Sequence, residues 1–296
     1  MTAQVLCVGV ITMDTIALVD RYPEADERVL AQEISRAGGG PAAVAAVALA
    51  RLGIPTAIAG TIGDDDDGRE ILRIFQREGI DASGVAISTY PTAGSVIVAA
   101  KEKSTRAISS RQMLRQSPPN APALRLAQSV DWIHCDHVGI TMLAELGITR
   151  GKAGRISFDA GYDVENFDPA IVDLFVPTDR QIALRHPSLT LAEGVAADAK
   201  RGRNVVVATR GSQGSAAYSD ADGYVEAPGF SVDVVSTLGA GDVFHGALIA
   251  QLVQGFPLQE ALLRANGVAA LSCLALDGQS GIPTTAQLDA YLEEHS

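Results

Sequence analysis

Several residue types are scarce in this chain of 296 residues, and each scarcity excludes a class of protein. The three cysteines, Cys7, Cys135 and Cys273, lie far apart and without CxxC spacing. They exclude a disulfide framework and predict buried free thiols in a reducing compartment. No apolar run reaches the roughly 18 residues of a membrane span. The first residues carry no basic leader, so we expect a soluble, cytoplasmic protein.

Positive charge is also in short supply. The chain has 23 Lys and Arg against 35 Asp and Glu, a formal net charge of −12. This balance argues against nucleic acid or an anionic membrane as the main partner, and an anionic substrate would need a local positive pocket. Hydrophobic residues make up 47% of the chain, which is enough to bury a sizeable core.

Familiar sequence motifs are missing as well. There is no GxxxxGK[ST], which excludes a P-loop, and no GxSxG, which weakens a serine hydrolase. The five histidines show no metal-ligand spacing, although His134 and His137 lie near the end of an expected strand and could line a site. The acidic run 64–67 favours a solvated loop and helix start over a cation site.

What the chain does have is an alternation of strand and helix patterns. We expect buried strands at 5–11, 56–62, 132–135, 156–159, 181–184 and 205–209. We expect helices at 41–52, 67–78, 142–149, 169–175, 190–201, 258–273 and 285–294. Alternation of this kind predicts an α/β fold with a mainly parallel sheet covered on both faces. Asp222-Gly223 predicts a hairpin within 218–228 at the sheet edge.

Two β-rich segments, about 12–36 and 90–110, do not fit this alternation. We expect them to leave the main sheet and pair with each other as a small lid, within a single domain that spans 1–296. We found no repeat, low-complexity run or linker that would divide the chain.

The stretch 234–246 is the most informative part of the sequence. It reads as an extended segment, a tight turn at Gly239-Ala240-Gly241, and a helix with its apolar residues on one face. Uncovered backbone N–H groups at a helix N-terminus form an anion site. Asp242 in the first turn could simply stabilise the helix start. It could also be an acid beside an anion hole, able to take a proton from an attacking hydroxyl.

Two other features could bind ligands. Gly38-Gly39-Gly40 with the following Pro-Ala-Ala matches the GxGxxA fingerprint of dinucleotide sites, but the strand before it is polar. The same glycines could let a helix approach a neighbouring backbone, or let a ligand approach closely. Asp14 follows the first expected strand, where parallel-sheet proteins place ligand groups.

Taken together, these motifs resemble the ribokinase-like carbohydrate kinases, also called the phosphofructokinase-B family, over nearly the whole chain. Gly39-Gly40, the Ala-rich helix and 50–53 are similar to the family's first signature, and 60–64 with Gly68 to the stretch just after it. Residues 237–242 with Phe244 and Gly246 are similar to its second, more specific signature. Residues 207–214 are similar to its nucleotide-side turn.

The resemblance implies a three-layer α/β/α ribokinase-like fold with a β lid, and ATP and Mg²⁺ as cofactors. Asp242 would be the general base toward a sugar hydroxyl, with Gly239, Ala240 and Gly241 as the anion hole. Substrate would bind at Asp14, Gly39 and Gly40. The nucleotide would lie along Thr209, Gly211 and Gly214, with Asn266 near its base. Lid strands in this family often pair between subunits, which implies a homodimer.

The chain departs from the family pattern at three places. Ser236 stands where the second signature usually opens with Asp, and Val44 replaces an Asn that contacts sugar. The family's NxxE, tied to Mg²⁺ and phosphate, is not recognisable in the matching region, 184–188, where Arg185 could contact phosphate instead.

These departures bear on the substrate. The signatures look most like the branch that contains sulfofructose kinase, without a clear sulfonate-binding arginine in the middle of the chain. Arg28, Arg106 and Arg111 in the expected lid strands are candidates for an acidic group on the sugar, or simply exposed strand charges. Two alternatives remain: a weakened kinase that only binds sugar or nucleotide, and a dinucleotide-dependent oxidoreductase.

Overall fold

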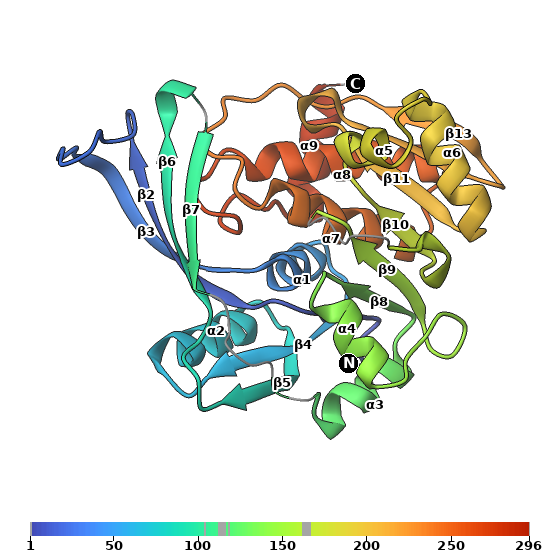
Figure 1. Cartoon of the computed structure of the whole chain (residues 1–296), viewed down its shortest axis with the longest axis horizontal. Coiled ribbons are helices and arrows are strands. Elements are labelled where there is room, and N and C mark those ends of the chain that lie inside the picture. The colour runs from blue at the N-terminus through green and yellow to red at the C-terminus, as the bar shows by residue number, and fades with distance from the viewer. Residues whose placement is uncertain (1, 104, 112–116, 118, 162–166, 296) are drawn as a thin grey trace.

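A nine-stranded sheet forms the centre of the computed structural model, which describes residues 2–103, 105–111, 117, 119–161 and 167–295 (Figure 1). Its strand order is β13-β12-β11-β10-β9-β8-β1-β4-β5. The strands are β1 (Val5–Val8), β4 (Thr56–Gly63), β5 (Asp81–Ser88), β8 (Trp132–Cys135), β9 (Arg155–Asp159), β10 (Leu174–Val176), β11 (Val205–Thr209), β12 (Ser215–Ser219) and β13 (Gly223–Ala227). All pair in parallel except β12 and β13, which form the expected hairpin at one edge.

Helices cover both faces of this sheet and complete the three-layer α/β/α architecture. One face carries α1 (Pro41–Arg51), α2 (Asp66–Arg77), α7 (Ala240–Val253), α8 (Leu258–Ser272) and α9 (Thr285–Glu294). The other carries α3 (Ala121–Ser129), α4 (Gly139–Glu145), α5 (Asp179–Arg185) and α6 (Leu191–Gly202). Successive side chains of a strand point to opposite faces, so strand β1 supplies Val5 and Cys7 to one core and Leu6 and Val8 to the other.

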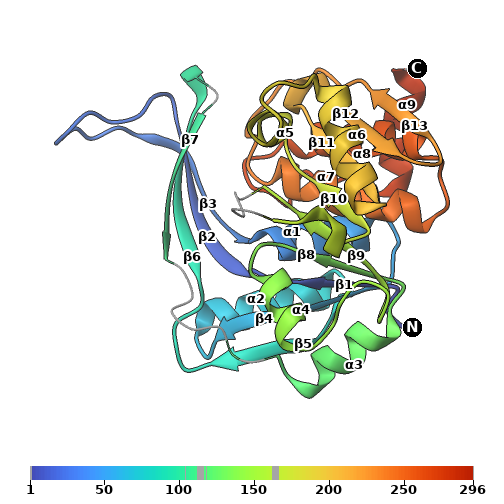
Figure 2. The same ribbon diagram turned by 45° about the vertical axis from the view of Figure 1, so that its right-hand side comes forward.

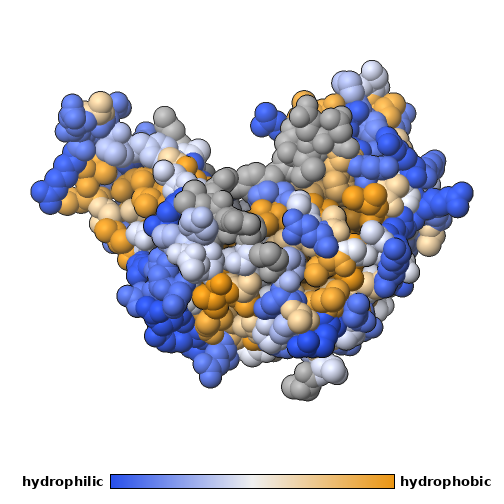
Figure 3. Space-filling view, turned by 60° about the horizontal axis from the view of Figure 1, so that its bottom comes forward, coloured by the Kyte–Doolittle hydropathy of each residue, from blue (hydrophilic) through white to orange (hydrophobic). Residues whose placement is uncertain are grey.

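A second, four-stranded sheet stands away from this body, as Figures 1 and 2 both show. It consists of β3 (Ala31–Gly39), β2 (Thr12–Val19), β6 (Gly94–Ala100) and β7 (Thr105–Arg111) in that order. The segments 12–36 and 90–110 therefore pair with each other, and we call this sheet the lid sheet. Figure 3 shows the surface hollowed between the lid sheet and the body.

The lid sheet is half buried. Ile16, Leu18, Ile97 and Ala99 on its inner face pack against Leu276 of the body. Ile34 and Val96 on the outer face are 69% and 60% exposed. The alternation of buried and exposed positions places one apolar face on the body and leaves the other uncovered.

Two expected elements of the central part are wrong. Residues 181–184 belong to helix α5 and not to a strand, and 169–175 contain a short 3₁₀ turn (Pro169–Ile171) and the start of strand β10 rather than a helix. Ile182 is buried and Leu184 is 66% exposed, the one-sided burial of a surface helix. The sequence analysis thus expected a helix where β10 begins and a strand where α5 lies. Strand β5 and helix α3 had no counterpart among the expected elements.

Candidate active site

The candidate site lies where the carboxyl ends of strands β1, β8 and β9 meet the start of α7. Strand β1 pairs with β4 on one side and with β8 on the other, so the chain order reverses there. Ligands bind at such switch points in open parallel sheets. Val8 is in register with Cys135, and Cys135 with Phe158, so the two residues that end these neighbouring strands, Asp136 and Asp159, come close together.

The turn before α7 has the form of an anion site. Gly239, the N-cap, adopts a left-handed backbone with φ of 73°, and no side chain caps the helix. Ala240 N lies 3.4 Å from Thr237 O, long for a backbone hydrogen bond. A Cβ built on Gly241 would meet no atom within 4 Å. No side chain therefore covers the start of α7, where the positive end of the helix dipole lies.

Close packing of α1 against α7 joins the two signature motifs. A Cβ on Gly246 would lie 2.4 Å from Ala45 O, so only glycine lets the helices approach this closely. Val44 Cγ1 lies 3.6 Å from the position of a Cβ on Gly239, beneath the turn. The small residues of α1, which the sequence shows as an Ala-rich run, thus fix the Gly239 turn relative to Gly40, the N-cap of α1.

Asp14 and the glycine turn before α1 are neighbours on the inner side of the lid sheet. Asp14 accepts a hydrogen bond of 2.9 Å from Ser95 N and is 8% exposed. A Cβ on Gly39 would lie 2.1 Å from Asp14 Oδ2, so the glycine is what admits the carboxylate. Gly40, with φ of +92°, packs against Val10 O. Burial raises the pKa of Asp14, and hydrogen bonds from Thr12 and Ser95 oppose the rise.

Asp242 is partly buried in the first turn of α7, among other carboxylates. Burial, together with the negative charges of Asp159 and Asp136, raises the pKa of Asp242 well above its usual range, and the charge of Arg106 opposes this. A carboxyl with a raised pKa is a stronger base than an ordinary one. The site therefore holds a carboxyl group that is more basic than an exposed aspartate.

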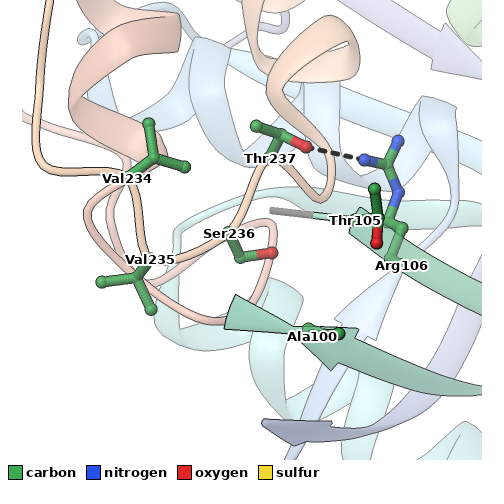
Figure 4. A pocket seen from close by; sticks show the side chains of 8 residues that line it. Ala100, Thr105, Arg106, Val234, Val235, Ser236 and Thr237 are labelled. Atoms are coloured by element: carbon green, nitrogen blue, oxygen red, sulfur yellow. Dashed lines mark hydrogen bonds between the residues drawn. The ribbon is translucent and has the colours of Figure 1, made fainter. Parts of the chain in front are cut away.

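The lid sheet contacts the turn through Arg106. Its Nη1 donates a 2.7 Å hydrogen bond to Thr237 Oγ1, across a small pocket lined also by Ser236, Val235 and Ala100 (Figure 4). The other predicted lid arginines lie elsewhere. Arg111 donates to Thr92 O, and Arg28 is exposed in the connection beyond the last pair of the β2–β3 ladder.

The residues predicted for the nucleotide gather at the end of β11. Thr209 ends this strand, and Gly211, with φ of 55° and open space around it, begins the turn that follows. Gly214 packs against residues 227–229, where a Cβ would lie 2.2 Å from Ala227 O. Asn266 of α8 donates to the carbonyl oxygens of Ala227 and Pro228 and so fastens the same segment. Thr209, Gly211, Gly214 and Asn266 thus share one local framework.

The structure corrects the region expected to match NxxE. Because 181–184 is helical, the chain leaves strand β10 at Pro177 instead, and Thr178 and Gln181 follow in a capping box at the start of α5. Arg185 does not face this edge: it pairs with buried Asp198 at 2.8 Å and donates to Phe167 O. Arg185 is therefore a structural residue and not a phosphate contact.

The sequence analysis missed Asp136 and Asp159. Asp136 accepts hydrogen bonds from the backbone N–H groups of Val10, Val138 and Gly139. Asp159 accepts one from Gly161 N at 2.6 Å. Their signal was an acidic residue at the carboxyl end of an expected buried strand, the same signal that singled out Asp14. His134, by contrast, is completely buried within β8 and lines no open surface.

A helix N-terminus open to an anion, with a carboxylic acid beside it at the edge of a parallel sheet, defines a phosphotransferase-like site. Comparison with known proteins gives the same class. Residues 2–285 match the model of the pfkB family of carbohydrate kinases. The chain belongs to this family, and it is an ATP-dependent carbohydrate kinase by class.

Two curated relatives match along nearly their whole length. An ATP-dependent ribose-1-phosphate kinase of Halopiger xanaduensis is 29% identical over 297 residues, covering 98% of both chains. A ribokinase of Bacillus subtilis is 26% identical over 303 residues, covering 97% of this chain and 99% of the relative. A dinucleotide-dependent oxidoreductase is therefore not supported. Gly38 and Gly39 are also the last residues of β3, which pairs antiparallel with β2 in the lid sheet and does not belong to the parallel sheet.

Solved structures share the fold. A putative ribokinase from Agrobacterium tumefaciens superposes with a TM-score of 0.87 at 23% identity, covering 100% of this chain and 99% of that one. A putative ribokinase II from E. coli, in complex with ATP and Mg²⁺, superposes with a TM-score of 0.83 at 21% identity, covering 99% and 100%. Within the described ranges, no helix is long and apolar enough to cross a membrane.

Proposed function

We propose that this chain transfers the γ-phosphoryl group of ATP to a hydroxyl of a sugar or sugar derivative, with Asp242 as general base. One observation carries the proposal: Asp242 lies partly buried in the first turn of α7, beside backbone N–H groups that no side chain caps. A base and an anion hole in one turn are the two parts that an attacking hydroxyl and a phosphoryl group require.

The protein's part in the reaction follows from this turn. Asp242 takes the proton of the acceptor hydroxyl while the hydroxyl oxygen forms its bond to the γ-phosphorus and the bond to the β-phosphate oxygen breaks. The N–H groups of Ala240 and Gly241, with the Gly239 turn shaping them, stabilise negative charge on the phosphoryl oxygens. Catalysis of this kind depends on positioning and electrostatics more than on covalent chemistry.

The nucleotide would extend from this turn toward Thr209 and the Gly211–Gly214 turn. Open space over Gly211 and Gly241 leaves the backbone at both turns accessible to phosphate oxygens. Mg²⁺, when bound, would neutralise charge on the phosphates. No three His, Cys, Asp or Glu side chains are grouped as metal ligands in the part of the chain that the structure describes. We therefore expect nucleotide phosphates and water to supply most of the oxygen ligands of the Mg²⁺ ion.

The acceptor would lie between the lid sheet and the body. Asp14, with Gly39 and Gly40 at the start of α1, supplies a carboxylate and an open backbone suited to sugar hydroxyls. Arg106 places a positive charge on the acceptor side of Asp242, which favours an acceptor with an acidic group such as a phosphosugar. Arg28 would contribute only with the β2–β3 connection folded inward. The lid sheet would exclude water, so that ATP is not hydrolysed.

We also propose that the outer face of the lid sheet pairs with a second copy of the chain. Ala17 is in register with both Ile34 and Val98, and Thr15 with Val96, so these residues share the face opposite Ile16 and Ile97. Ile34 and Val96 are the large exposed apolar residues of this face. A dimer through the lid would remove this apolar surface from water.

The test of the kinase proposal is ADP release with Mg-ATP across a panel of pentoses, ketohexoses, sugar acids, sugar phosphates and nucleosides. Asp242→Asn should lower turnover by about 10²- to 10⁴-fold, the usual contribution of a general base, while the protein stays folded. Asp233→Asn, an exposed aspartate before the turn, is the matched control and should retain activity.

Two outcomes would contradict the proposal. Equal activity of Asp242→Asn and the unmodified protein would remove Asp242 from the reaction. A panel without turnover by a folded protein that still binds ATP would favour a weakened, binding-only member of the family.

A further inference from the structure

A buried histidine and aspartate lie directly behind the candidate base. His245 Nε2 is 3.1 Å from Asp159 Oδ1, and the two side chains are 5% and 6% exposed. Asp242 and His245 are three residues apart on α7 and therefore share one face of the helix. Asp159, at the end of β9, lies within hydrogen-bonding reach of both side chains. A continuous line of polar groups thus runs from Asp242 into the core.

The surrounding residues hold this line in place. Gly161 N donates a 2.6 Å hydrogen bond to Asp159 Oδ1, the same atom that faces His245. The His134 ring lies 5.6 Å from the His245 ring, centroid to centroid, on the side away from solvent. Within the described residues, His245 Nδ1 is buried without a hydrogen-bond partner. Nε2 is therefore the nitrogen that this ring uses, and it is aimed at Asp159.

A hydrogen bond between two carboxyl groups requires one proton between them. Building on the proposed function, we propose that Asp159, fixed by His245, shares the proton that Asp242 takes from the acceptor hydroxyl, and that this pairing sets the pH range of catalysis. The proton passes from the hydroxyl to Asp242 as the new O–P bond forms. It then lies in the Asp242–Asp159 hydrogen bond until the product leaves and solvent removes it.

The titratable and charged groups that face the pair come from three elements and the connection that follows β8. They are His245 on α7, His134 on β8, Asp136 just after β8, and Arg106 on β7. Burial raises the pKa of Asp159, but the charge and hydrogen bond of His245 outweigh it and hold that pKa at about 2. Burial and the Asp159 charge raise the pKa of Asp242. The single proton of the pair therefore resides on Asp242, and the form ready to act as base is the one in which both carboxyls are ionised.

Asp159 and His245 are positioning residues in this scheme, and the pH–rate profile tests them. Asp159→Asn keeps an oxygen that accepts from His245 and Gly161 but removes the negative charge, so the acidic limb of kcat/KM should move down by at least about one pH unit. His245→Leu removes the donor that stabilises the ionised pair, so the limb should move up by about one unit. His245→Gln retains an N–H at the Nε2 position and should keep the limb within about 0.3 units.

His186→Gln is the matched control for the imidazole substitution. His186 Nε2 lies 3.1 Å from buried Asp198 in a pair away from the site, and its replacement should leave the limb unchanged. Opposite shifts in Asp159→Asn and His245→Leu cannot arise from a general disturbance of packing. Unshifted limbs in both variants, with Asp242→Asn inactive, would overturn the pairing and leave the kinase proposal intact.

A readout that needs no turnover keeps the two proposals separate. In ¹³C-carboxyl NMR of the ligand-free protein, an aspartate that titrates well above the ordinary range should be missing from the Asp242→Asn spectrum, whereas Asp14 and Asp136, whose pKa values burial also raises, should remain in it. The midpoint of the missing aspartate should fall in Asp159→Asn. An Asp242→Asn spectrum that has lost no high-titrating aspartate would overturn the inference, whether or not an acceptor has been found.

Discussion

Arg106 Nη1 donates a 2.7 Å hydrogen bond to Thr237 Oγ1, and this contact joins the lid sheet to the turn that begins α7. The guanidinium also lowers the pKa of Asp242, against the larger effects of burial and the neighbouring carboxylates. The Arg106 side chain therefore both joins the lid sheet to this turn and offsets negative charge around Asp242, the proposed base. Because Arg106 contacts this turn and Arg28 is exposed elsewhere, substitution of each arginine should affect acceptor binding differently.

Arg106→Gln should raise KM for the acceptor by about tenfold, because one charged hydrogen bond contributes on the order of 1.5–3 kcal/mol. The loss should be larger for a phosphorylated or acidic acceptor than for a neutral sugar. Steady-state kinetics with both kinds of acceptor measures this. Arg28→Gln is the matched control and should change KM less than threefold, because Arg28 is exposed beyond the β2–β3 ladder. Equal effects of the two substitutions would contradict the assignment of Arg106.

Two glycines of the second signature serve different purposes, and alanine should distinguish them. Gly241→Ala introduces a methyl group into open space in the first turn of a helix, so thermal unfolding should show equal or slightly higher stability. The methyl would occupy the space over the turn that phosphate requires, so kcat should fall by at least about tenfold.

Gly246→Ala should instead lower the stability of the protein more than its activity. Its Cβ would lie 2.4 Å from Ala45 O and force α1 and α7 apart, at a cost of about 1–3 kcal/mol of folding free energy. The folded fraction should lose less kcat than Gly241→Ala does, because the new methyl group lies between the helices and not over the turn. Chemical denaturation and kinetics of both variants make the comparison. A destabilised Gly241→Ala with normal kcat would show that the open turn is structural.

Much of the fold could be predicted because most of its strands and helices have a clear pattern of apolar residues and clear ends. Strand β1 is a continuous apolar run buried on both faces, and α1 is framed by Gly40-Pro41 at its start. Strand β10 could not be recognised because it is only three residues long. A short apolar run does not reveal its period, and Ile182 and Leu184 offered an equally plausible strand next to it.

Some residues of the candidate site could likewise be predicted from the sequence, and others could not. Asp242 stands within a local motif, so its neighbours in sequence identify it. Asp159 and His245 are far apart in sequence. They meet only because β9 pairs with β8 and α7 packs against the central sheet. No local pattern encodes that contact. The sequence offered Arg106 as one of three candidate lid arginines, and only the pairing of β6 with β7 and the contact with Thr237 distinguish it from the other two.

The lid face gives a prediction about assembly. Ile34→Glu and Val96→Glu place charges on the exposed apolar face of the lid sheet, opposite the face that carries Ile16 and Ile97. If two copies pair through this face, each substitution should shift the protein from dimer to monomer in analytical ultracentrifugation. Leu184→Glu, on exposed helix α5, is the control and should not change the mass. A monomeric parent protein would rule out pairing through the lid.

His134 should make the stability of the protein depend on pH. Burial lowers its pKa to about 3, with a further contribution from the charge of His245, whereas an unfolded histidine titrates near 6.5. Below pH 6.5 the unfolded chain therefore binds a proton that the folded protein does not. The stability that the neutral ring contributes is fully present above pH 6.5 and is lost as the pH falls toward 3.

The expected loss for this one residue is about 2 kcal/mol between pH 6.5 and pH 5, at 1.36 kcal/mol per pH unit. Asp242, whose raised pKa acts in the opposite direction over the same range, would mask part of this loss in the parent protein. The difference between the parent and His134→Gln isolates the histidine, because Asp242 is present in both. Urea denaturation at the two pH values should show a smaller pH dependence in His134→Gln, whereas exposed His295→Gln should match the parent. Parallel pH dependences of the parent and His134→Gln would mean that the buried ring accepts its proton without leaving the folded state.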